Sequence, residues 1–507
     1  MLSSGSCCVS SRGWVSSCQL RSQQEAETRW KHCALGKNLV AKSLTVLLYG
    51  DVVGYVTWEG SERSLRFRYT TDYLHRSVVP LSLRLPLSDE VYDNRRVAPY
   101  LESLVPENPA TRRRWADQLS VSSTDAFVLL SKMGTDCPGA VQFVQEGDEE
   151  RVLGRPAGLR ELGEAEIADR LRRLADDSAS WTMNDEHWSL AGQQSKFALA
   201  YSDGRWYRAT GSAPTTHIFK PGIGRLQHQA LVEYATMRAA RTIGLDVAHV
   251  EFTTFEDQQA VVIERFDRVR GQNGIVSRVH QEDLCSATGR APWRKYESDG
   301  GPMARDMMQL FRRNSTSPRH DAAALVDFMA VNYLAGAPDG HSKNIAMLLL
   351  PGRIRLAPLY DLATAFPYDL PGYRTVALSI GGKRNHGAVH PKDWNKVAEI
   401  VGMPAEEVHG RVERIARDLP TAYSEALAAV GSAASRQVAA RSVNKMAKHC
   451  GATLDGFTHY ARRQAASRAS TDRESLPLRR ASGIPTVPRV GGSDPDSGSS
   501  RGPRPDL

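Results

Sequence analysis

The chain has 507 residues, 41% of them hydrophobic, which fits a folded protein with one large core or two lobes and room for unstructured ends. No apolar stretch approaches the roughly 20 residues that a membrane-spanning helix needs, so neither a membrane span nor a membrane partner is expected. The net charge of +8 lies at the ends, since residues 1–43 carry six Lys/Arg against two Asp/Glu, residues 461–507 carry nine against five, and the body is neutral.

The first 43 residues are Ser-rich and charged, and they hold four of the seven cysteines. We expect residues 1–43 to be a disordered extension or a mis-assigned start, because they lack the continuous apolar core and cleavage site of a secretory signal. The other three cysteines are scattered through the body, which is typical of a cytoplasmic protein without disulfides or zinc sites.

Residues 44–150 are predicted to form a small α+β subdomain. Two apolar segments flank Gly50-Asp51, a pair that favours the positive φ angles of a tight turn, so residues 44–58 indicate a hairpin. Further segments are a strand over 65–69 and the proline-containing stretches 80–87 and 105–109, which are typical of edges and loops.

Residues 151–302 are predicted to form a β-rich lobe. The alternation of Leu and Ile with charge predicts an amphipathic helix over 160–175 that joins it to the preceding subdomain. A second helix carries Leu231 and ends at Gly244. The strands expected in this lobe are 197–201 and 206–208, joined at Asp203-Gly204, followed by 216–219 and 260–266.

Residues 303–464 are predicted to be mainly helical. Asp321 can cap a helix with an apolar stripe that ends near Gly336, and a hairpin follows over 345–356. Further helices are expected over 393–401, 405–418 and 422–429. From 465 to 507 the content of Arg, Ser, Pro and Gly predicts a disordered basic tail.

The densest polar cluster is the segment 337–344, between a helix and a hairpin. Its Asp339 and Asn344 are five positions apart, the separation of the base and the metal-binding amide in the protein-kinase catalytic loop. The hairpin then delivers Tyr360-Asp361, whose carboxylate can share Mg²⁺ with the Asn344 oxygen. Considered alone, Asp339-Gly340 could be an ordinary turn and Asp361 an ordinary surface carboxylate or helix cap. The order of helix, D-x-x-x-x-N loop, short hairpin and Asp along the chain favours phosphoryl transfer.

Phosphoryl transfer also needs a cation near the nucleotide phosphates. Lys220 ends a strand, and Glu233 on the following helix is placed to hold it, although a solvated lysine and a helix-surface glutamate are equally ordinary. Small residues in 189–196 would let backbone N–H groups approach phosphate, but one glycine is far from a phosphate-loop motif. Residues 261–268 fit either a hinge that contacts adenine or an edge strand with solvated charges.

Together these segments resemble the HipA family, the kinase toxins of bacterial HipBA-type toxin–antitoxin modules. The resemblance is colinear from about residue 44 to residue 463 and implies an α+β, two-lobed protein-kinase-like fold: a β-rich N-terminal lobe with an added small subdomain, and a mainly helical C-terminal lobe. It rests on SLAGQQSK (189–196), PTTHIFK (214–220), VIERFDR (262–268), HQEDLC (280–285), KYESDGGP (295–302), DGHSKN (339–344) and YD (360–361).

The resemblance implies that Asp339 is the general base, that Asn344 and Asp361 hold Mg²⁺, and that Lys220 contacts the ATP phosphates. It also implies that Ser189 is autophosphorylated, a change that in the family displaces the phosphate loop and silences the enzyme. The implied nucleotide contacts are Ala191, Gly192, Gln193, Gln194, Ser195 and Lys196 in the phosphate loop, Glu264, Arg265 and Phe266 in the hinge, and His341, Ser342, Lys343, Asn344, Tyr360 and Asp361 around the catalytic loop. Pro338, Gln193 and Ser195 depart from the family pattern without removing a metal ligand or the base.

The function that the resemblance implies is an ATP- and Mg²⁺-dependent serine/threonine protein kinase, the cytoplasmic toxin of a type II toxin–antitoxin module linked to persistence. Its expected partner is a HipB-like helix-turn-helix antitoxin, and the family's protein substrates include aminoacyl-tRNA synthetases. A second hypothesis is a non-catalytic, nucleotide-binding co-repressor. It is motivated by that partner and by the basic loop 382–386, with DNA contact mainly indirect through the antitoxin. Transfer of AMP by the same site is a third.

Overall fold

The computed structural model describes residues 43–59, 64–153, 158–181, 186–272, 274–368 and 374–474. The described residues up to Thr458 form one compact unit, and those from His459 onward form a second. The predictions of disorder for 1–42 and 475–507 lie outside the described residues. Within the described ranges, no helix combines the length and apolarity that crossing a membrane requires.

The first sheet confirms the predicted N-terminal hairpin. Its four antiparallel strands have the order β3-β2-β1-β4, so β1 is paired on both sides and all but its first residue are buried. Leu48 pairs with Asp51, which puts the turn at Tyr49 (φ 56°) and Gly50 (φ 90°), one residue earlier than predicted. The strands are β1 (Ser43–Leu48), β2 (Asp51–Glu59), β3 (Ser64–Tyr69) and β4 (Val141–Gln145), and the accompanying helices are α2 (Thr71–Arg76), α3 (Asn94–Ser103), α4 (Pro109–Gln118), α5 (Ala126–Met133) and α6 (Glu149–Leu153).

The second sheet has six antiparallel strands in the order β5-β7-β6-β8-β10-β9, and it contributes to two hydrophobic cores. Successive side chains of β10 point to opposite faces. Ala260 and Val262 therefore join the core of the first sheet, whereas Val261 and Ile263 join the core of the helical region. The strands are β5 (Gly158–Leu162), β6 (Phe197–Ser202), β7 (Arg205–Thr210), β8 (His217–Lys220), β9 (Val250–Phe255) and β10 (Gln258–Glu264), with helices α7 (Glu164–Asp176) and α8 (Gln229–Thr242).

The predicted helix over 160–175 is wrong in its first turn. Residues Gly158–Leu162 form β5, which pairs with β7, and the helix begins only after Gly163. The Glu166 carboxylate accepts the Gly163 N–H at 3.1 Å, which fixes the start of α7 there. Residues 158–162 are a strand because they pair with a strand almost 50 residues away, despite the helical periodicity of the charged segment. The local sequence gives no signal of this pairing.

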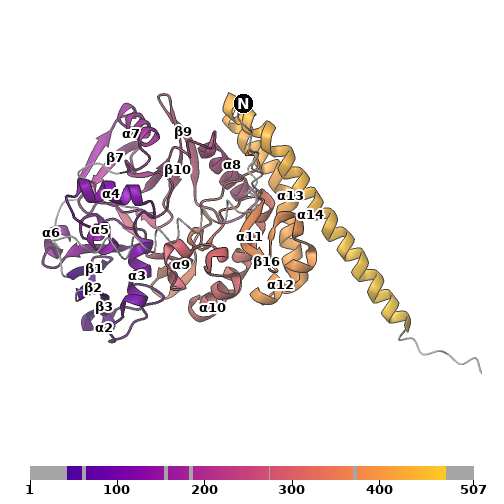
Figure 1. The fold of residues 1–507 in the computed structure, drawn as a ribbon, viewed down its shortest axis with the longest axis horizontal. Coiled ribbons are helices and arrows are strands. Elements are labelled where there is room, and N and C mark those ends of the chain that lie inside the picture. Colours follow the sequence, from indigo (N-terminus) through magenta and orange to yellow (C-terminus); the bar gives the residue numbers. More distant parts are fainter. Residues whose placement is uncertain are drawn as a thin grey trace, which may run out of the picture. The chain divides into compact units, whose positions relative to one another are not determined.

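Helices α11, α12 and α13 lie side by side in Figure 1 and contact one another, forming the core of the helical region. Two predicted helices, 405–418 and 422–429, are one continuous helix that passes through Pro420. Asp321 is not the cap of its helix: it lies in the first turn, where its carboxylate accepts from Ser315 Oγ and Leu356 N. The helices are α10 (Ala304–Asn314), α11 (Pro318–Ala335), α12 (Pro391–Val401), α13 (Ala405–Val430) and α14 (Ala433–Glu474). Helix α14 contradicts the prediction that order ends at residue 465.

Short elements complete the fold around the helical region. The predicted hairpin at 345–356 is confirmed and forms a three-stranded sheet with one upstream strand, in the order β13-β14-β15. These elements are β11 (Arg268–Arg270), β12 (Val276–Arg278), β13 (Gln281–Asp283), α9 (Leu284–Ala287), η1 (Pro292–Arg294), η2 (Glu297–Asp299), η3 (Ser342–Asn344), β14 (Ala346–Leu350), β15 (Arg353–Leu356), β16 (Thr375–Ile380), β17 (Lys383–Asn385) and η5 (His386–Ala388). The three described cysteines are unpaired and buried, as expected.

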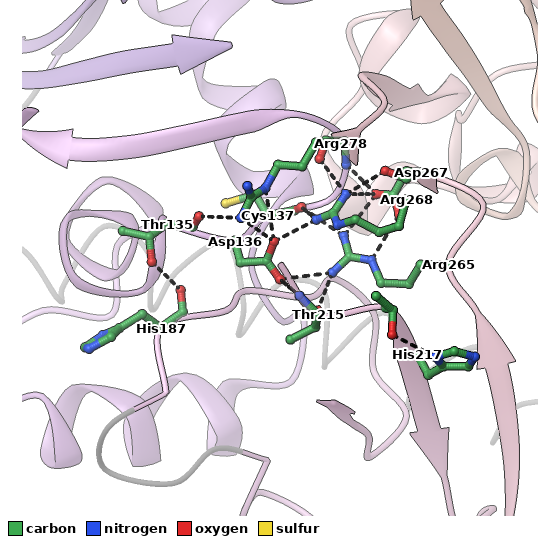
Figure 2. Close-up of polar contacts among 12 residues, drawn as sticks. Thr135, Asp136, Cys137, His187, Thr215, His217, Arg265, Asp267, Arg268 and Arg278 are labelled. Atoms are coloured by element: carbon green, nitrogen blue, oxygen red, sulfur yellow. Dashed lines mark hydrogen bonds and ion pairs between the residues drawn. The ribbon is translucent and has the colours of Figure 1, made fainter. Parts of the chain in front are cut away.

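A buried ion cluster ties the region of the first sheet to the end of β10 (Figure 2). The Asp136 carboxylate lies 2.8 Å from Arg268, 3.1 Å from Arg278 and 3.4 Å from Arg265. Asp267 supplies a second carboxylate to Arg265 and Arg268. Burial would raise the pKa of Asp136, but the guanidinium groups hold it below its ordinary value. The cluster therefore stays charged, and it fixes the polypeptide just beyond β10.

Candidate active site

The catalytic-loop candidate follows the end of α11, where Gly336 adopts a left-handed conformation (φ 62°) that ends the helix. The backbone oxygen of Asp339 accepts hydrogen bonds from the His341 N–H and the Asn344 side chain, both at 2.8 Å. The loop is drawn tightly against α11, because a Cβ on Gly340 would lie 2.6 Å from the Asn332 side chain. The Asp339 side chain is 59% exposed, although Gly340 and His341, which follow it, are buried.

Lys220, at the end of β8, is bound by two carboxylates. Its ammonium donates to Glu233 Oε1 on α8 at 2.7 Å and to Asp361 Oδ1 at 2.5 Å. The side chains of Lys220 and Glu233 are almost fully buried, whereas that of Asp361 is 34% exposed. Burial alone would lower the pKa of Lys220, but the two carboxylates raise it above its ordinary value, so the ammonium stays charged.

The backbone around Asp361 holds its carboxylate in place. The preceding Leu359 bridges to the segment after α8, since its N–H donates to Asp246 O and its oxygen accepts from Ala248 N. Tyr360 donates its hydroxyl to Lys343 O at 2.6 Å, which joins this segment to the catalytic loop. Asp361 itself has φ 60°, a conformation that non-glycine residues seldom adopt outside constrained sites.

The oxygen groups of Asn344 and Asp361 fit a magnesium ion. Asn344 uses its amide nitrogen on Asp339 O, so the side-chain oxygen is the atom left for a cation. Lys220 binds Asp361 through Oδ1 only. Within the described ranges no three His, Cys, Asp or Glu side chains gather as a metal site. A site of one carboxylate and one amide oxygen, completed by phosphate and water, is the coordination that Mg²⁺ accepts.

The phosphate-loop candidate lies against Lys220 and α8. Gly192 has φ 104°, a backbone conformation that residues with a side chain rarely adopt, so glycine is favoured at this position. Gln194 donates to Gln229 at 2.9 Å, and Gln229 donates to Glu233 at 3.2 Å, which links the loop to the partner of Lys220.

Lys196 is a second cation beside this loop. It donates to Ala191 O at 2.8 Å and lies 5.3 Å above the centre of the Trp181 ring. Burial and the neighbouring Lys220 ammonium lower the pKa of Lys196 to about 8. An anionic ligand would relieve the repulsion between the two ammonium groups, so the pair fits nucleotide phosphates.

Other predicted site residues make internal contacts. Ser342 donates its hydroxyl to Lys295 O at 2.9 Å, and Lys343 donates to Asp283 Oδ2 at 3.2 Å. His341 is different, because its Nδ1 is buried without a hydrogen-bond partner in the described part of the chain. A ligand bound beside the catalytic loop would satisfy that atom, whereas the side chains of Ser342 and Lys343 already have partners.

The hinge candidate offers backbone groups rather than side chains. Arg265 lies in the ion cluster of Figure 2, where its guanidinium contacts Asp136 and Asp267. The N–H groups of Glu264 and Arg265 already donate to the oxygens of His249 and Thr216. An adenine ring would therefore have to use the remaining backbone groups of 264–266.

Ser189 lies two residues before the phosphate loop in the chain and is fully buried. Its hydroxyl donates to Leu104 O at 2.6 Å, and its N–H donates to Asp136 O at 2.9 Å. Its hydroxyl therefore faces the region of the first sheet, and a phosphoryl donor can reach it only after this segment moves.

Glu107, Lys295 and Tyr296 are site neighbours to which the sequence analysis gave no role. Glu107 accepts from Lys295 at 2.8 Å, and its N–H donates to Gly192 O at 2.9 Å. Tyr296 donates its hydroxyl to Asp339 Oδ1. Lys295 and Tyr296 stand in the KYESDGGP motif, which was the available signal for them, whereas Glu107 had none.

Fold and site together define a protein-kinase-like chain, with a Lys–Glu pair in the β-rich part and an Asp-x-x-x-x-Asn loop in the helical part. Family models agree with this class: the HipA N-terminal domain matches residues 44–144, and the HipA-like C-terminal domain matches residues 188–423. The chain belongs to the HipA family.

Relatives extend the similarity over most of the chain. The Sinorhizobium fredii protein Y4mE is 33% identical, over 77% of this chain and 93% of the relative. The serine/threonine-protein kinase toxin HipA of Shewanella oneidensis is 29% identical, over 76% of this chain and 90% of the relative. The solved HipA of Shewanella oneidensis, in complex with HipB and operator DNA, matches with a TM-score of 0.71 at 25% identity, covering 81% of this chain and 97% of that one.

Proposed function

We propose that this chain is an ATP- and Mg²⁺-dependent serine/threonine protein kinase. The observation that carries the proposal is the double contact of Lys220 with Glu233 and Asp361, beside the loop that holds Asp339 and Asn344. A lysine held by a helix glutamate, next to a carboxylate that can carry a metal, is the arrangement by which kinases fix the phosphates of ATP.

The nucleotide would lie between the phosphate loop and the catalytic loop. Lys220 and Lys196 supply positive charge for the phosphates, and His341 Nδ1 supplies a buried polar atom without a partner in the described part of the chain. Asn344 and Asp361 would hold Mg²⁺, which when bound neutralises charge on the transferring phosphoryl group. The chain thus provides a cationic, largely buried cradle at the donor side.

Asp339 is the group that we assign to the acceptor. Its exposed carboxylate can accept the proton of a serine or threonine hydroxyl as the hydroxyl oxygen bonds to the γ-phosphorus. The bond from that phosphorus to the bridging oxygen then breaks, and ADP leaves. Alignment of the hydroxyl against the phosphorus supplies much of the rate, because little covalent chemistry falls to the protein.

Regulation by phosphorylation of Ser189 belongs to the same proposal. A phosphate at this fully buried position cannot be accommodated beside Leu104 O, and its charge would force the segment outward. Displacement would carry away Gly192 and Lys196, which form the donor cradle.

We further infer that the chain acts as the toxin of a toxin–antitoxin module with a HipB-like partner. Support comes from the similar Shewanella oneidensis protein, which is named a toxin and was solved with HipB and operator DNA. Purification of this chain with the product of an adjacent helix-turn-helix gene tests the partnership.

The co-repressor alternative gains little from its basic loop. Arg384 donates to Val376 O, and burial beside His449 lowers the pKa of His386 to about 4, so that His386 is neutral. Of the three basic residues in 382–386, only Lys383 is exposed and directed to solvent.

The test of transfer is incubation with γ-labelled ATP and Mg²⁺. We expect label in the protein or in an added acceptor, and none with Asp339→Ala, which should keep its affinity for ADP. Intact-mass analysis distinguishes added phosphate from added AMP. ADP-binding protein that labels nothing would contradict the proposal.

A further inference from the structure

The segment 295–302 is fixed as a tight turn. Gly300 has φ 77°, and a Cβ on Gly301 would lie 2.3 Å from Arg294 O and 2.6 Å from Tyr296 O. Gly300 is favoured because residues with a side chain rarely adopt this positive φ, and Gly301 is needed because backbone oxygens cannot move aside as a flexible side chain can. The KYESDGGP motif therefore encodes a particular backbone shape next to the catalytic loop.

Contacts on both sides of Tyr296 hold this turn against the helical region. Lys295 O accepts from Ser342 Oγ at 2.9 Å, which joins the turn to the catalytic loop. The Glu297 carboxylate accepts from the N–H and the hydroxyl of Ser379, at 2.7 and 2.6 Å. The residue between them, Tyr296, consequently has little freedom to move its backbone.

The Tyr296 side chain contacts the carboxylate of Asp339, the proposed base. Its hydroxyl donates to Asp339 Oδ1, and its ring meets His341 edge to face, with centroids 4.8 Å apart and planes at 82°. His341 Nε2 is 3.7 Å from the same Oδ1. Both neighbours thus contact one carboxylate oxygen, which leaves Oδ2 for an acceptor hydroxyl.

We propose that Tyr296 is a positioning residue for the base: its hydroxyl holds the Asp339 carboxylate in the rotamer that turns Oδ2 toward the acceptor. The inference rests on the proposed kinase function. An aspartate on an exposed loop rotates readily about its last torsion, so a fixed second contact is needed for productive alignment. Burial and the Asp339 charge raise the pKa of Tyr296, so the phenol remains a donor.

The test uses Tyr296→Phe, which removes the hydroxyl and keeps the ring on His341. We expect the maximal rate of phosphate transfer to an added protein acceptor, dephosphorylated casein, to fall about tenfold, the effect of losing one hydrogen bond to a charged group. The ATP concentration for half-maximal rate and the affinity for ADP should stay unchanged. Tyr73→Phe is the matched control, because it removes a phenol hydrogen bond to Val79 O in the region of the first sheet.

Each outcome separates the two proposals. A wild type that binds ADP but transfers no phosphate would overturn the kinase function and this inference with it. An active wild type with full rate in Tyr296→Phe would overturn the inference alone, and so would a faster variant, since the tyrosine would then obstruct the base. If the transfer rate fell in Tyr296→Ala but not in Tyr296→Phe, only the aromatic ring would matter, and the inference about the hydroxyl would be overturned.

Discussion

The Glu107 carboxylate accepts a hydrogen bond from the Lys295 ammonium at 2.8 Å, across 188 positions of sequence. Lys343 lies 3.7 Å from the other carboxylate oxygen, so one buried anion faces two ammonium groups. The loop before α4 therefore contributes a charge to the catalytic loop, and its backbone also contacts Gly192 of the phosphate loop.

Glu107→Gln should destabilise the fold at neutral pH, because it leaves the buried Lys295 ammonium without its carboxylate and Lys343 with Asp283 alone. We expect a loss of about 3 kcal/mol in the free energy of unfolding, as for other broken buried pairs. Urea denaturation at pH 7 measures it. Arg96→Gln, which breaks an exposed pair with Glu90, is the control and should change little.

The stabilisation that the Glu107 carboxylate gives to the fold should depend on pH. Burial would raise the pKa of Glu107, but Lys295 and Lys343 lower it from 4.5 to about 2. A lowered folded-state pKa means that the stabilisation is complete above the unfolded-state value near 4.5 and is lost as the pH falls toward 2. The stability difference between wild type and Glu107→Gln should therefore shrink between pH 5 and pH 3. A constant difference would contradict the assignment.

Asp136→Asn should be strongly destabilising, since it leaves three guanidinium groups with the Asp267 carboxylate alone. Removing one partner of a buried ion cluster costs about 3–5 kcal/mol. Thermal and urea unfolding measure the loss. Asp72→Asn, which breaks an exposed contact with Arg76, should have no measurable effect; equal effects of the two changes would show that the cluster adds no stability.

The lowered pKa of Lys196, about 8, predicts weaker nucleotide binding in alkali. Because the ammonium loses its proton above pH 8, the affinity for ADP should fall by up to about tenfold per pH unit beyond that value. Lys196→Arg keeps its charge throughout, so its affinity should stay level between pH 7.5 and pH 9.5. Calorimetric titration of both proteins gives the comparison, and parallel slopes would exclude Lys196 as the cause.

Ser189→Asp should displace the phosphate loop, because a carboxylate cannot occupy a fully buried site that faces Leu104 O. Faster hydrogen exchange over 186–196 and a weaker affinity for ADP are expected. Ser189→Ala should retain both properties of the wild type. Unchanged protection in Ser189→Asp would mean that charge at this position does not release the segment.

The chain order of local motifs was enough to predict that these segments lie close together. Asp339, Asn344 and Asp361 stand at the ends of elements whose periodicity is strong, and Lys220 closes a predicted strand. Their contacts confirm that these separate segments meet, although their roles in transfer stay predictions. The hairpins were predicted for the same reason, since a turn and its two strands are adjacent in sequence.

What the sequence analysis missed depends on distant partners. Glu107 and Asp136 look like ordinary loop carboxylates, and only folding shows that they face distant cations, such as Arg265, 129 positions from Asp136, and Lys295, 188 positions from Glu107. The same reason explains β5, which is a strand because β7 lies beside it. Helix α14 was cut short because its Arg- and Ser-rich composition resembles that of a disordered tail.

The alternation of β10 between two cores has a consequence for how the molecule can be divided. A fragment that stops before residue 250 would leave the edge of β8 without its partner strand β10, and a fragment that starts there would lack α8, which packs against β9, β10 and α13. Because each fragment would lack part of its packing, we expect neither to fold alone. The two parts of the intact protein should therefore unfold in a single cooperative transition. Splitting the gene at this point would thus be expected to yield insoluble fragments rather than two working pieces.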